Sequence, residues 1–177
     1  TNFSEFDGDF GISQLAEGAI DALPFEDASF DVVTCSWVLE HLENPVGCIQ
    51  EIARVLAPGG RLLFITPNAL NYVVWLRRLV PTRLSRRVVK RIYGRDEDFI
   101  NPTYYRMNTP ADIEHICNRA GLAHVQLATV SDPTYLALNE VLFQVSMLVE
   151  RILEAVYPQG RVHLVGVYEK TDSLPTI

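Results

Sequence analysis

The sequence predicts an α/β fold in which a largely parallel sheet carries helices on both faces. Two short apolar segments, 30–35 and 61–66, are rich in Val, Leu and Phe and are typical of buried parallel strands. Between them, apolar residues recur at helical spacing from Ile49 to Leu56. A strand, a helix and a second strand in this order form the repeating unit of a doubly wound sheet.

The elements before residue 61 are predicted from local signals. The polar, acidic stretch 1–11 is expected to be a loop, and residues around 12–20 are expected to carry a short strand. Asn44 is the expected cap of the first helix, and Pro45 suits its first turn. The turn formed by Pro58, Gly59 and Gly60 is expected to end that helix and to lead into the strand at 61–66.

The region after the second strand is predicted to leave the sheet before a further helix begins. Residues 70–108 are expected to form a helical insertion that resembles a lid, with two helices broken at Pro81. Thr109 caps the next helix, Pro110 sits in its first turn, and Gly121 closes it. The sheet is therefore expected to resume only after Gly121.

Three further elements complete a single domain over 1–177. A strand is expected at 122–130, and alternating residues predict the last strand at 161–170. Between them, 135–157 has apolar residues at strongly helical spacing. This long amphipathic helix is expected to pack on the domain or on a second subunit, so a homodimer is one interpretation.

Composition and charge exclude several classes of protein. The chain has 177 residues, 48% of them hydrophobic and 21% charged, which fits one globular domain with a real core. The net charge of −7 argues against nucleic acid as a partner, because binding to phosphates needs a basic face. Three cysteines without metal-ligand spacing indicate reduced thiols, and hence a cytoplasmic protein. No apolar run approaches the ~20 residues that span a bilayer.

Basic residues are concentrated in one segment. Through residue 60 there is one basic residue, Arg54, against eleven acidic ones, whereas eight of the fifteen basic residues fall between 77 and 95. This basic segment has three interpretations: a lid that guides an anionic substrate, a membrane-surface helix over 72–95, or a solvated face paired with the acidic N-terminal half. Its position after a strand end favours the lid.

Four motifs between 18 and 68 occur in a specific combination. They are Gly-Ala-Ile-Asp-Ala-Leu-Pro-Phe, Phe-Asp-Val-Val-Thr-Cys-Ser, Leu-Glu-His-Leu, and Glu-Ile-Ala-Arg-Val-Leu-Ala-Pro-Gly-Gly followed by a strand. Together they resemble the class I S-adenosylmethionine-dependent methyltransferases that act on small molecules. The resemblance covers about 12–70 well and 109–170 more weakly.

The resemblance implies a Rossmann-like methyltransferase sheet with strand order 3-2-1-4-5-7-6 and a helical insertion after the fifth strand. The family's glycine-rich cofactor loop has no counterpart before Gly18, and the N-terminal strands are expected to be missing. The segment 30–35 would be the fourth strand. We therefore expect a remnant of four or five strands, with an exposed or dimer-covered edge at 30–35.

The resemblance also implies where the cofactor S-adenosylmethionine would bind. Ala19 stands where the family has an acid that meets the adenine amino group, and the backbone amide of Ile20 would meet a ring nitrogen. Asp21 would be the family's second acid, or simply a turn-favouring residue before Leu-Pro-Phe. Ser36 and Trp37, at the end of the fourth strand, would line the methionine portion of the cofactor.

The candidate base is His41, in the Leu-Glu-His-Leu motif. A histidine there suits proton removal from a hydroxyl or amine while the methyl group transfers, although a structural or capping histidine is the alternative. Glu40 is expected to be a surface or cap partner. Tyr104, Tyr105 and Arg106, at the end of the insertion, are candidate substrate contacts.

The function expected from these residues is methyl transfer from S-adenosylmethionine to a small-molecule acceptor. The absent glycine loop and Ala19 favour a rival: a truncated, non-catalytic relative that acts in binding or dimer assembly. A fragment of a nicotinamide dehydrogenase is a further rival. The absence of a Gly-x-Gly-x-x-Gly loop and the presence of the Leu-Pro-Phe and Glu-His-Leu motifs count against it.

Overall fold

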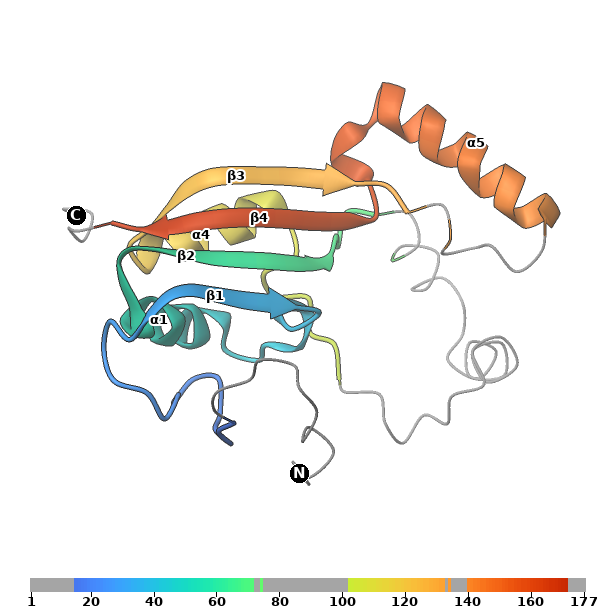
Figure 1. The fold of residues 1–177 in the computed structure, drawn as a ribbon. Helices are drawn as coiled ribbons and strands as arrows, with labels where there is room; N and C mark the ends of the chain where they lie inside the picture. The colour runs from blue at the N-terminus through green and yellow to red at the C-terminus, as the bar shows by residue number, and fades with distance from the viewer. Residues whose placement is uncertain (1–14, 72–73, 75–101, 133, 135–139, 172–177) are drawn as a thin grey trace, which may run out of the picture.

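Four strands build one sheet in the computed structural model, which describes residues 15–71, 74, 102–132, 134 and 140–171 (Figure 1). The order across the sheet is β1-β2-β4-β3. The strands are β1 (Phe30–Ser36), β2 (Leu56–Pro67), β3 (Leu122–Val130) and β4 (His163–Lys170). β1 runs parallel to β2, and β4 runs antiparallel to both β2 and β3. This order matches 4-5-7-6 of the expected sheet.

The first crossover is the predicted strand, helix and strand. Helix α1 (Pro45–Val55) begins at its predicted cap: the Asn44 side chain accepts a hydrogen bond from the backbone N–H of Gly47 at 3.3 Å. Pro45 occupies the first turn, where its missing N–H costs nothing. The helix therefore starts where its local signals placed it.

β2 begins five residues earlier than the sequence predicted. Leu56 already pairs with Phe30, and the next pair is Val32 with Arg61, so the Pro-Gly-Gly turn lies inside an irregular part of the strand. A Cβ on Gly60 would lie 3.1 Å from the carbonyl oxygens of Phe30 and Asp31, so only glycine fits there without a shift. The start of β2 is decided by its pairing with β1. That pairing cannot be predicted from the residues around Leu56 alone.

The elements after the insertion follow their predictions closely. Helix α4 (Pro110–Arg119) is capped by Thr109, whose hydroxyl accepts from the Asp112 N–H at 3.2 Å. Gly121 follows the helix with a φ of 76°, which glycine adopts without strain. β3 occupies the predicted residues, and β4 begins two residues later than predicted.

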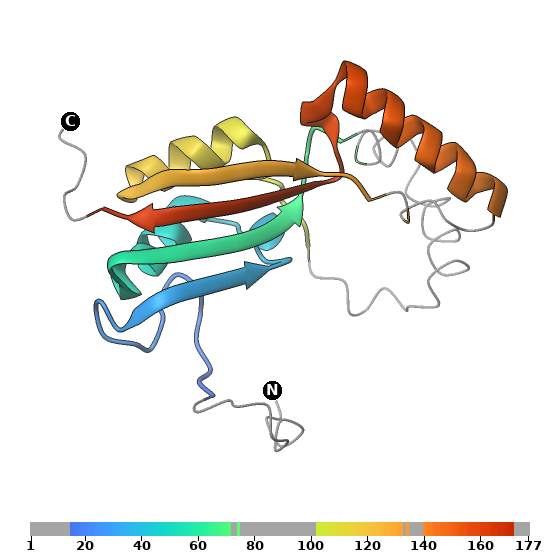
Figure 2. The ribbon, with the colours of Figure 1, turned by 45° about the horizontal axis from the view of Figure 1, so that its top comes forward.

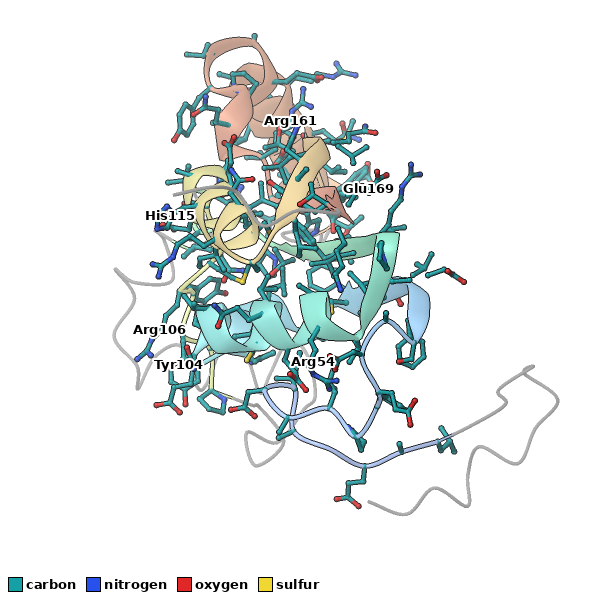
Figure 3. All side chains as sticks on the ribbon, turned by 90° about the vertical axis from the view of Figure 1, so that its left-hand side faces the viewer. Arg54, Tyr104, Arg106, His115, Arg161 and Glu169 are labelled. Atoms are coloured by element: carbon teal, nitrogen blue, oxygen red, sulfur yellow. The ribbon has the colours of Figure 1, made fainter. Side chains whose placement is uncertain are left out.

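The core lies on one face of the sheet. Helices α1 and α4 pack against each other and cover this face, as Figure 2 and Figure 3 show. Phe64 on β2 stacks on Tyr168 of β4 with ring centroids 6.0 Å apart. No described helix packs on the opposite face, where Val32 is 52% exposed. The second helical layer of the expected fold is therefore not among the described residues.

β1 is an edge of the sheet within the described part of the chain. It pairs with β2 alone, which confirms the expected four-stranded remnant with an open edge at this strand. The additional strand expected around 12–20 is not found from residue 15 onward, so that prediction is wrong there. The structure has only an isolated bridge between Ala19 and Ala22 in its place. Residues 12–14 lie outside the described part.

Helix α5 (Glu140–Val156) projects from the sheet (Figure 1). It matches most of the helix predicted at 135–157, of which 135–139 lie outside the described residues. A row of its apolar side chains is exposed: Val141, Val145, Leu148, Ile152 and Val156. Arg161 holds the end of the helix near β3, because its guanidinium pairs with Glu154 at 2.5 Å and donates to the Thr129 carbonyl at 3.2 Å.

Two further predictions concern the membrane and the cysteines. Among the described helices, none is long and apolar enough to cross a bilayer. Cys35, Cys48 and Cys117 are buried free thiols, as expected, and the described residues hold no cluster of potential metal ligands. Most of the insertion predicted at 70–108, including the basic segment 77–95, lies outside the described residues.

Candidate functional site

The candidate site is at the carboxyl edge of the sheet, where β1 and β2 end and β4 begins. Ser36 is the last residue of β1, and the backbone N–H of Trp37 donates to the carbonyl of Ile65 on β2 at 3.0 Å. A short 3-10 turn, Leu39–His41, follows at once. This connection places the predicted Ser36, Trp37 and His41 in succession along one edge.

The imidazole of His41 has a defined tautomer. Its Nδ1 lies 2.9 Å from the carbonyl oxygen of Pro102, and a carbonyl can only accept. Nδ1 therefore carries the hydrogen, which leaves Nε2 of the neutral ring as a proton acceptor. The side chain is 30% exposed, so Nε2 is within reach of a small molecule. This geometry suits the proton removal that the sequence suggested.

Glu40 is buried, with 5% of its surface exposed, which corrects the expectation of a surface or cap residue. Its Oε2 accepts from the Thr66 hydroxyl at 3.0 Å, and Oε1 lies 3.9 Å from His41 Nε2. The amide of Asn108 donates to the Thr66 oxygen at 2.7 Å and to the Pro67 carbonyl at 3.0 Å. The buried carboxylate of Glu40 thus lies beside His41. Hydrogen bonds link it to Thr66 at the end of β2 and, through Thr66, to Asn108 before α4.

The predicted substrate contacts lie beside the base. The backbone N–H groups of Tyr104 and Tyr105 both donate to the Glu40 carbonyl, at 2.8 and 3.3 Å. Arg106 donates to the Glu43 carbonyl and lies over the Tyr104 ring at 5.3 Å. Figure 3 shows Tyr104 and Arg106 next to the start of α1. The structure therefore brings together His41 and all three predicted contacts.

A second group of residues at this edge was not predicted. The Trp37 ring meets the His163 ring edge-to-face, with centroids 4.9 Å apart. His163 Nε2 lies 3.2 Å from Asp132 Oδ2, and Thr134 donates to the other Asp132 oxygen. Because β4 is antiparallel, its first residue lies at the same edge as the last residues of β2 and β3. An antiparallel last strand would place its first residues at the carboxyl edge, so this topology could have identified His163 as a site candidate.

Ala19 and Ile20 lie just before a segment that α1 holds, and Ile20 packs against the core. Glu51 on α1 accepts from the Leu23 N–H at 2.9 Å, and Arg54 donates to the Leu23 carbonyl at 3.2 Å. In the described residues, neither Ala19 nor Ile20 forms a hydrogen bond with Ser36, Trp37 or His41. The adenine contacts expected at Ala19 and Ile20 therefore stay a prediction.

The described residues fit part of the expected cofactor site. Ser36 and Trp37 are exposed at the end of β1, so their side chains are open to a ligand. An open depression of about 660 Å³ lies elsewhere, and none of the predicted site residues lines it. Its lining residues are Leu70, Thr109, Pro110, Ala111, Glu114, Leu127, Thr129, Pro158 and Gln159. We base the site on the edge residues, because they carry the chemistry.

Comparison with known proteins decides the family. A family model described as a methyltransferase domain matches residues 4–64. A ubiquinone biosynthesis O-methyltransferase of Azoarcus sp. (strain BH72) is 31% identical over 64% of this chain and 44% of its own. A demethylmenaquinone methyltransferase of Mycobacterium tuberculosis (strain ATCC 25618 / H37Rv) is 35% identical over 67% of this chain and 56% of its own.

The chain belongs to the class I S-adenosylmethionine-dependent methyltransferase family. It spans about half the length of these curated methyltransferases. The methyltransferase fold is also found in solved structures. A SAM-dependent methyltransferase from Methanosarcina mazei matches with a TM-score of 0.52 at 16% identity, over 87% of this chain and 65% of that chain.

The same fold also hosts other chemistry. The cyclase SpnF matches with a TM-score of 0.50 at 14% identity, over 89% of this chain and 56% of that chain. At such identities the likeness shows the fold alone, and a fold does not determine a reaction. The function of this methyltransferase-family chain must therefore be argued from its site residues.

Proposed function

We propose that this chain carries the acceptor side of a methyltransferase site and supports methyl transfer from S-adenosylmethionine to a small molecule. The observation that carries the proposal is the His41 imidazole, which is fixed by Pro102 with Nε2 as its acceptor nitrogen. The relatives act, by their names, on ubiquinone precursors and demethylmenaquinone. A quinone-type ring is therefore the acceptor that we favour.

When bound, the cofactor supplies an electrophilic methyl group on a sulfonium sulfur. For transfer to a hydroxyl, the S–CH₃ bond breaks and an O–CH₃ bond forms. The hydroxyl proton goes to His41 Nε2, and the sulfonium becomes a neutral thioether. Glu40, 3.9 Å from that nitrogen, would then face an imidazolium and stabilise its charge. Ser36 and the backbone at Trp37 would line the methionine portion of the cofactor, which leaves the Trp37 indole free for another contact.

The residues beside the base are proposed to orient the acceptor. Tyr104 and Arg106 come from a segment that hydrogen-bonds to the Leu39–His41 turn and to Glu43. Methyl transfer is an in-line displacement that gains most from positioning. The hydrogen bonds between this segment and the turn that carries His41 therefore support a joint role.

The proposal is tested by following transfer of a radiolabelled methyl group to hydroxylated benzene and naphthalene rings. His41→Ala should lower kcat by about 10²- to 10⁴-fold, the usual contribution of a positioned base. His115→Ala, on the exposed face of α4, is the matched control and should leave kcat unchanged. Equal rates in the His41 variant and the wild type would contradict a base at this position.

Two further roles are proposed for the whole protein. The exposed row on α5 supports self-association, because an apolar stripe of this length favours a partner surface. Sedimentation of the wild type and of Leu148→Glu tests this, and an unchanged monomeric profile for both would oppose it. The three interpretations of the basic segment 77–95 remain proposals: a lid, part of a membrane-surface helix over 72–95, or a solvated face. The buried free thiols support a cytoplasmic location.

A further inference from the structure

We propose that the flat ring of the methyl acceptor stacks on the indole of Trp37, which we call the platform. His163, Asp132 and Thr134 hold this indole in place, and we call these three residues the brace. This inference rests on the proposed function and names the residues that select an aromatic acceptor. It concerns a group of side chains on the opposite side of the β2 end from Thr66 and Asn108.

The backbone of Trp37 is strained. Its φ is 58°, a left-handed value that is rare and unfavourable for a bulky side chain. The strain is maintained by the hydrogen bond from its N–H to Ile65. Since 44% of the residue remains exposed, burial of the indole does not explain the strain. An aromatic side chain held at the site edge at such a cost points to a ligand contact.

The indole is supported from one side. The His163 ring stands nearly perpendicular to it, at 83°, with centroids 4.9 Å apart, which is a favourable edge-to-face contact. His163 is 5% exposed and joins Asp132 at 3.2 Å. The Thr134 N–H and hydroxyl donate to Asp132 at 3.0 and 2.5 Å. Each member of this brace is thus fixed by the next.

The carboxylate of Asp132 is charged in this arrangement. Burial alone would raise its pKa, but hydrogen bonds from Thr134 and His163 outweigh burial, so the pKa of Asp132 is lowered. A charged acceptor at this position orients the His163 ring. The brace therefore fixes the direction of the indole as well as its distance from β4.

The indole and the base come from the same connection. Trp37 lies two residues before the Leu39–His41 turn, so one short segment carries both a flat surface and a proton acceptor. Two stacked aromatic rings attract each other beyond what the burial of their area contributes. A ring on Trp37 would gain this attraction, whereas an aliphatic acceptor would not. The geometry therefore favours an aromatic acceptor.

The first experiment measures binding without any methyl transfer. In Trp75→Phe, Trp37 is the single tryptophan, and its emission reports on the indole. Titration with 2,3-dimethyl-1,4-naphthoquinone should quench this emission to saturation, and a saturated bicyclic diol should not. If S-adenosylhomocysteine quenches and the naphthoquinone does not, the platform holds the cofactor and the proposal fails. Absence of saturable quenching by either probe also overturns it.

The second experiment compares variants by equilibrium dialysis of the same naphthoquinone. Trp37→Leu should raise Kd about 10-fold, Trp37→Phe less than 3-fold, and Asp132→Asn about 3-fold. Asp27→Asn, an exposed partner of Arg54, is the control and should leave Kd unchanged. Urea unfolding verifies that each variant is folded. An unchanged Kd in folded Trp37→Leu would refute the platform.

The failure of this inference can be told apart from failure of the proposed function. Quinone binding that depends on Trp37, in a protein without methyl transfer, leaves the platform standing and removes the activity. Methyl transfer with the same KM and kcat in the wild type and Trp37→Leu leaves the activity standing and removes the platform. Trp37→Leu is expected to raise KM for an aromatic acceptor more than it lowers kcat.

Discussion

At the scale of single residues, the carboxyl edge depends on buried polar groups that satisfy one another. The Thr66 hydroxyl donates to Glu40 and accepts from Asn108, so it links the turn after β1 to the segment before α4. Losing such a link leaves a buried carboxylate oxygen without its donor, which costs more than losing an exposed hydrogen bond.

Thr66→Val should therefore destabilise the fold by about 1–3 kcal/mol, the usual cost of an unsatisfied buried polar group. Urea unfolding followed by circular dichroism measures this free energy. Thr129→Val is the matched control, because its hydroxyl bonds an exposed site at Pro158, and it should cost less than about 1 kcal/mol. Equal losses in the two variants would show that Glu40 does not need the Thr66 hydroxyl.

The thiols illustrate the effect of burial on a single group. Burial raises the pKa of Cys35 to about 11 and that of Cys117 to about 12, so both stay protonated at neutral pH. A disulfide reagent such as Ellman's reagent should react with the native protein far more slowly than with the protein in urea, below about pH 10. Rapid reaction of three thiols at pH 7 in the native state would contradict this.

At the scale of elements, close contacts between strands determine which side chains fit. Phe64 on β2 covers Gly166 on β4, and a Cβ on Gly166 would lie 2.2 Å from the ring. Such a contact cannot exist, so either the ring or the strand must move. Gly166 thus leaves the space on β4 that the Phe64 ring fills.

Gly166→Ala should destabilise the fold by about 1–3 kcal/mol, because the added methyl overpacks the core. Thermal or urea unfolding measures the loss. Combining it with Phe64→Leu should recover part of the stability, since the smaller side chain leaves room for the methyl. Additive losses in the double variant would show that the glycine is required for another reason.

The contact between the end of β3 and the start of β4 depends on pH. The folded pKa of Asp132 is lowered, so the stability that its pair with His163 contributes is present above the unfolded pKa of about 4. It is lost as the pH falls through the folded pKa. Asp132→Asn should cost about 1 kcal/mol or less at pH 7 and less at pH 3, measured by urea unfolding at both values.

The sequence predicted correctly those elements whose ends are set by residues close by in the sequence. Thr109, Pro110 and Gly121 encode the start and end of α4 within their own segment. The burial of Glu40 could not be predicted in this way, because it depends on Thr66 and Asn108, which are 26 residues or more distant in sequence. The sequence therefore indicated His41 and its neighbours as candidates, but not the partners that fix them in the structure.

At the scale of the whole molecule, the described sheet has two edges of different character. β1 pairs on one side only and is regular from Val32 to its end, whereas the other edge strand, β3, is interrupted between His124 and Gln126. A regular, open strand invites pairing with another chain, while an irregular one resists it. Of the two sheet edges, β1 is thus the one where strand pairing with another chain, and hence aggregation, is expected.

Val32→Lys should slow aggregation, because a charge on the open edge opposes strand pairing. Val125→Lys on β3 is the matched control: the two residues are 52% and 47% exposed. Light scattering at constant protein concentration measures both. If the two variants aggregate at the same rate, the open edge at β1 does not control aggregation.

The sheet order has a consequence for synthesis on the ribosome. β4 lies between β2 and β3, although it is made after both of them. Until His163–Lys170 has left the ribosome, β2 and β3 have no strand between them, and Phe64 lacks its partner Tyr168. The sheet can therefore close only after β4 has emerged. Nascent chains that stop before residue 163 are expected to be the forms that chaperones hold.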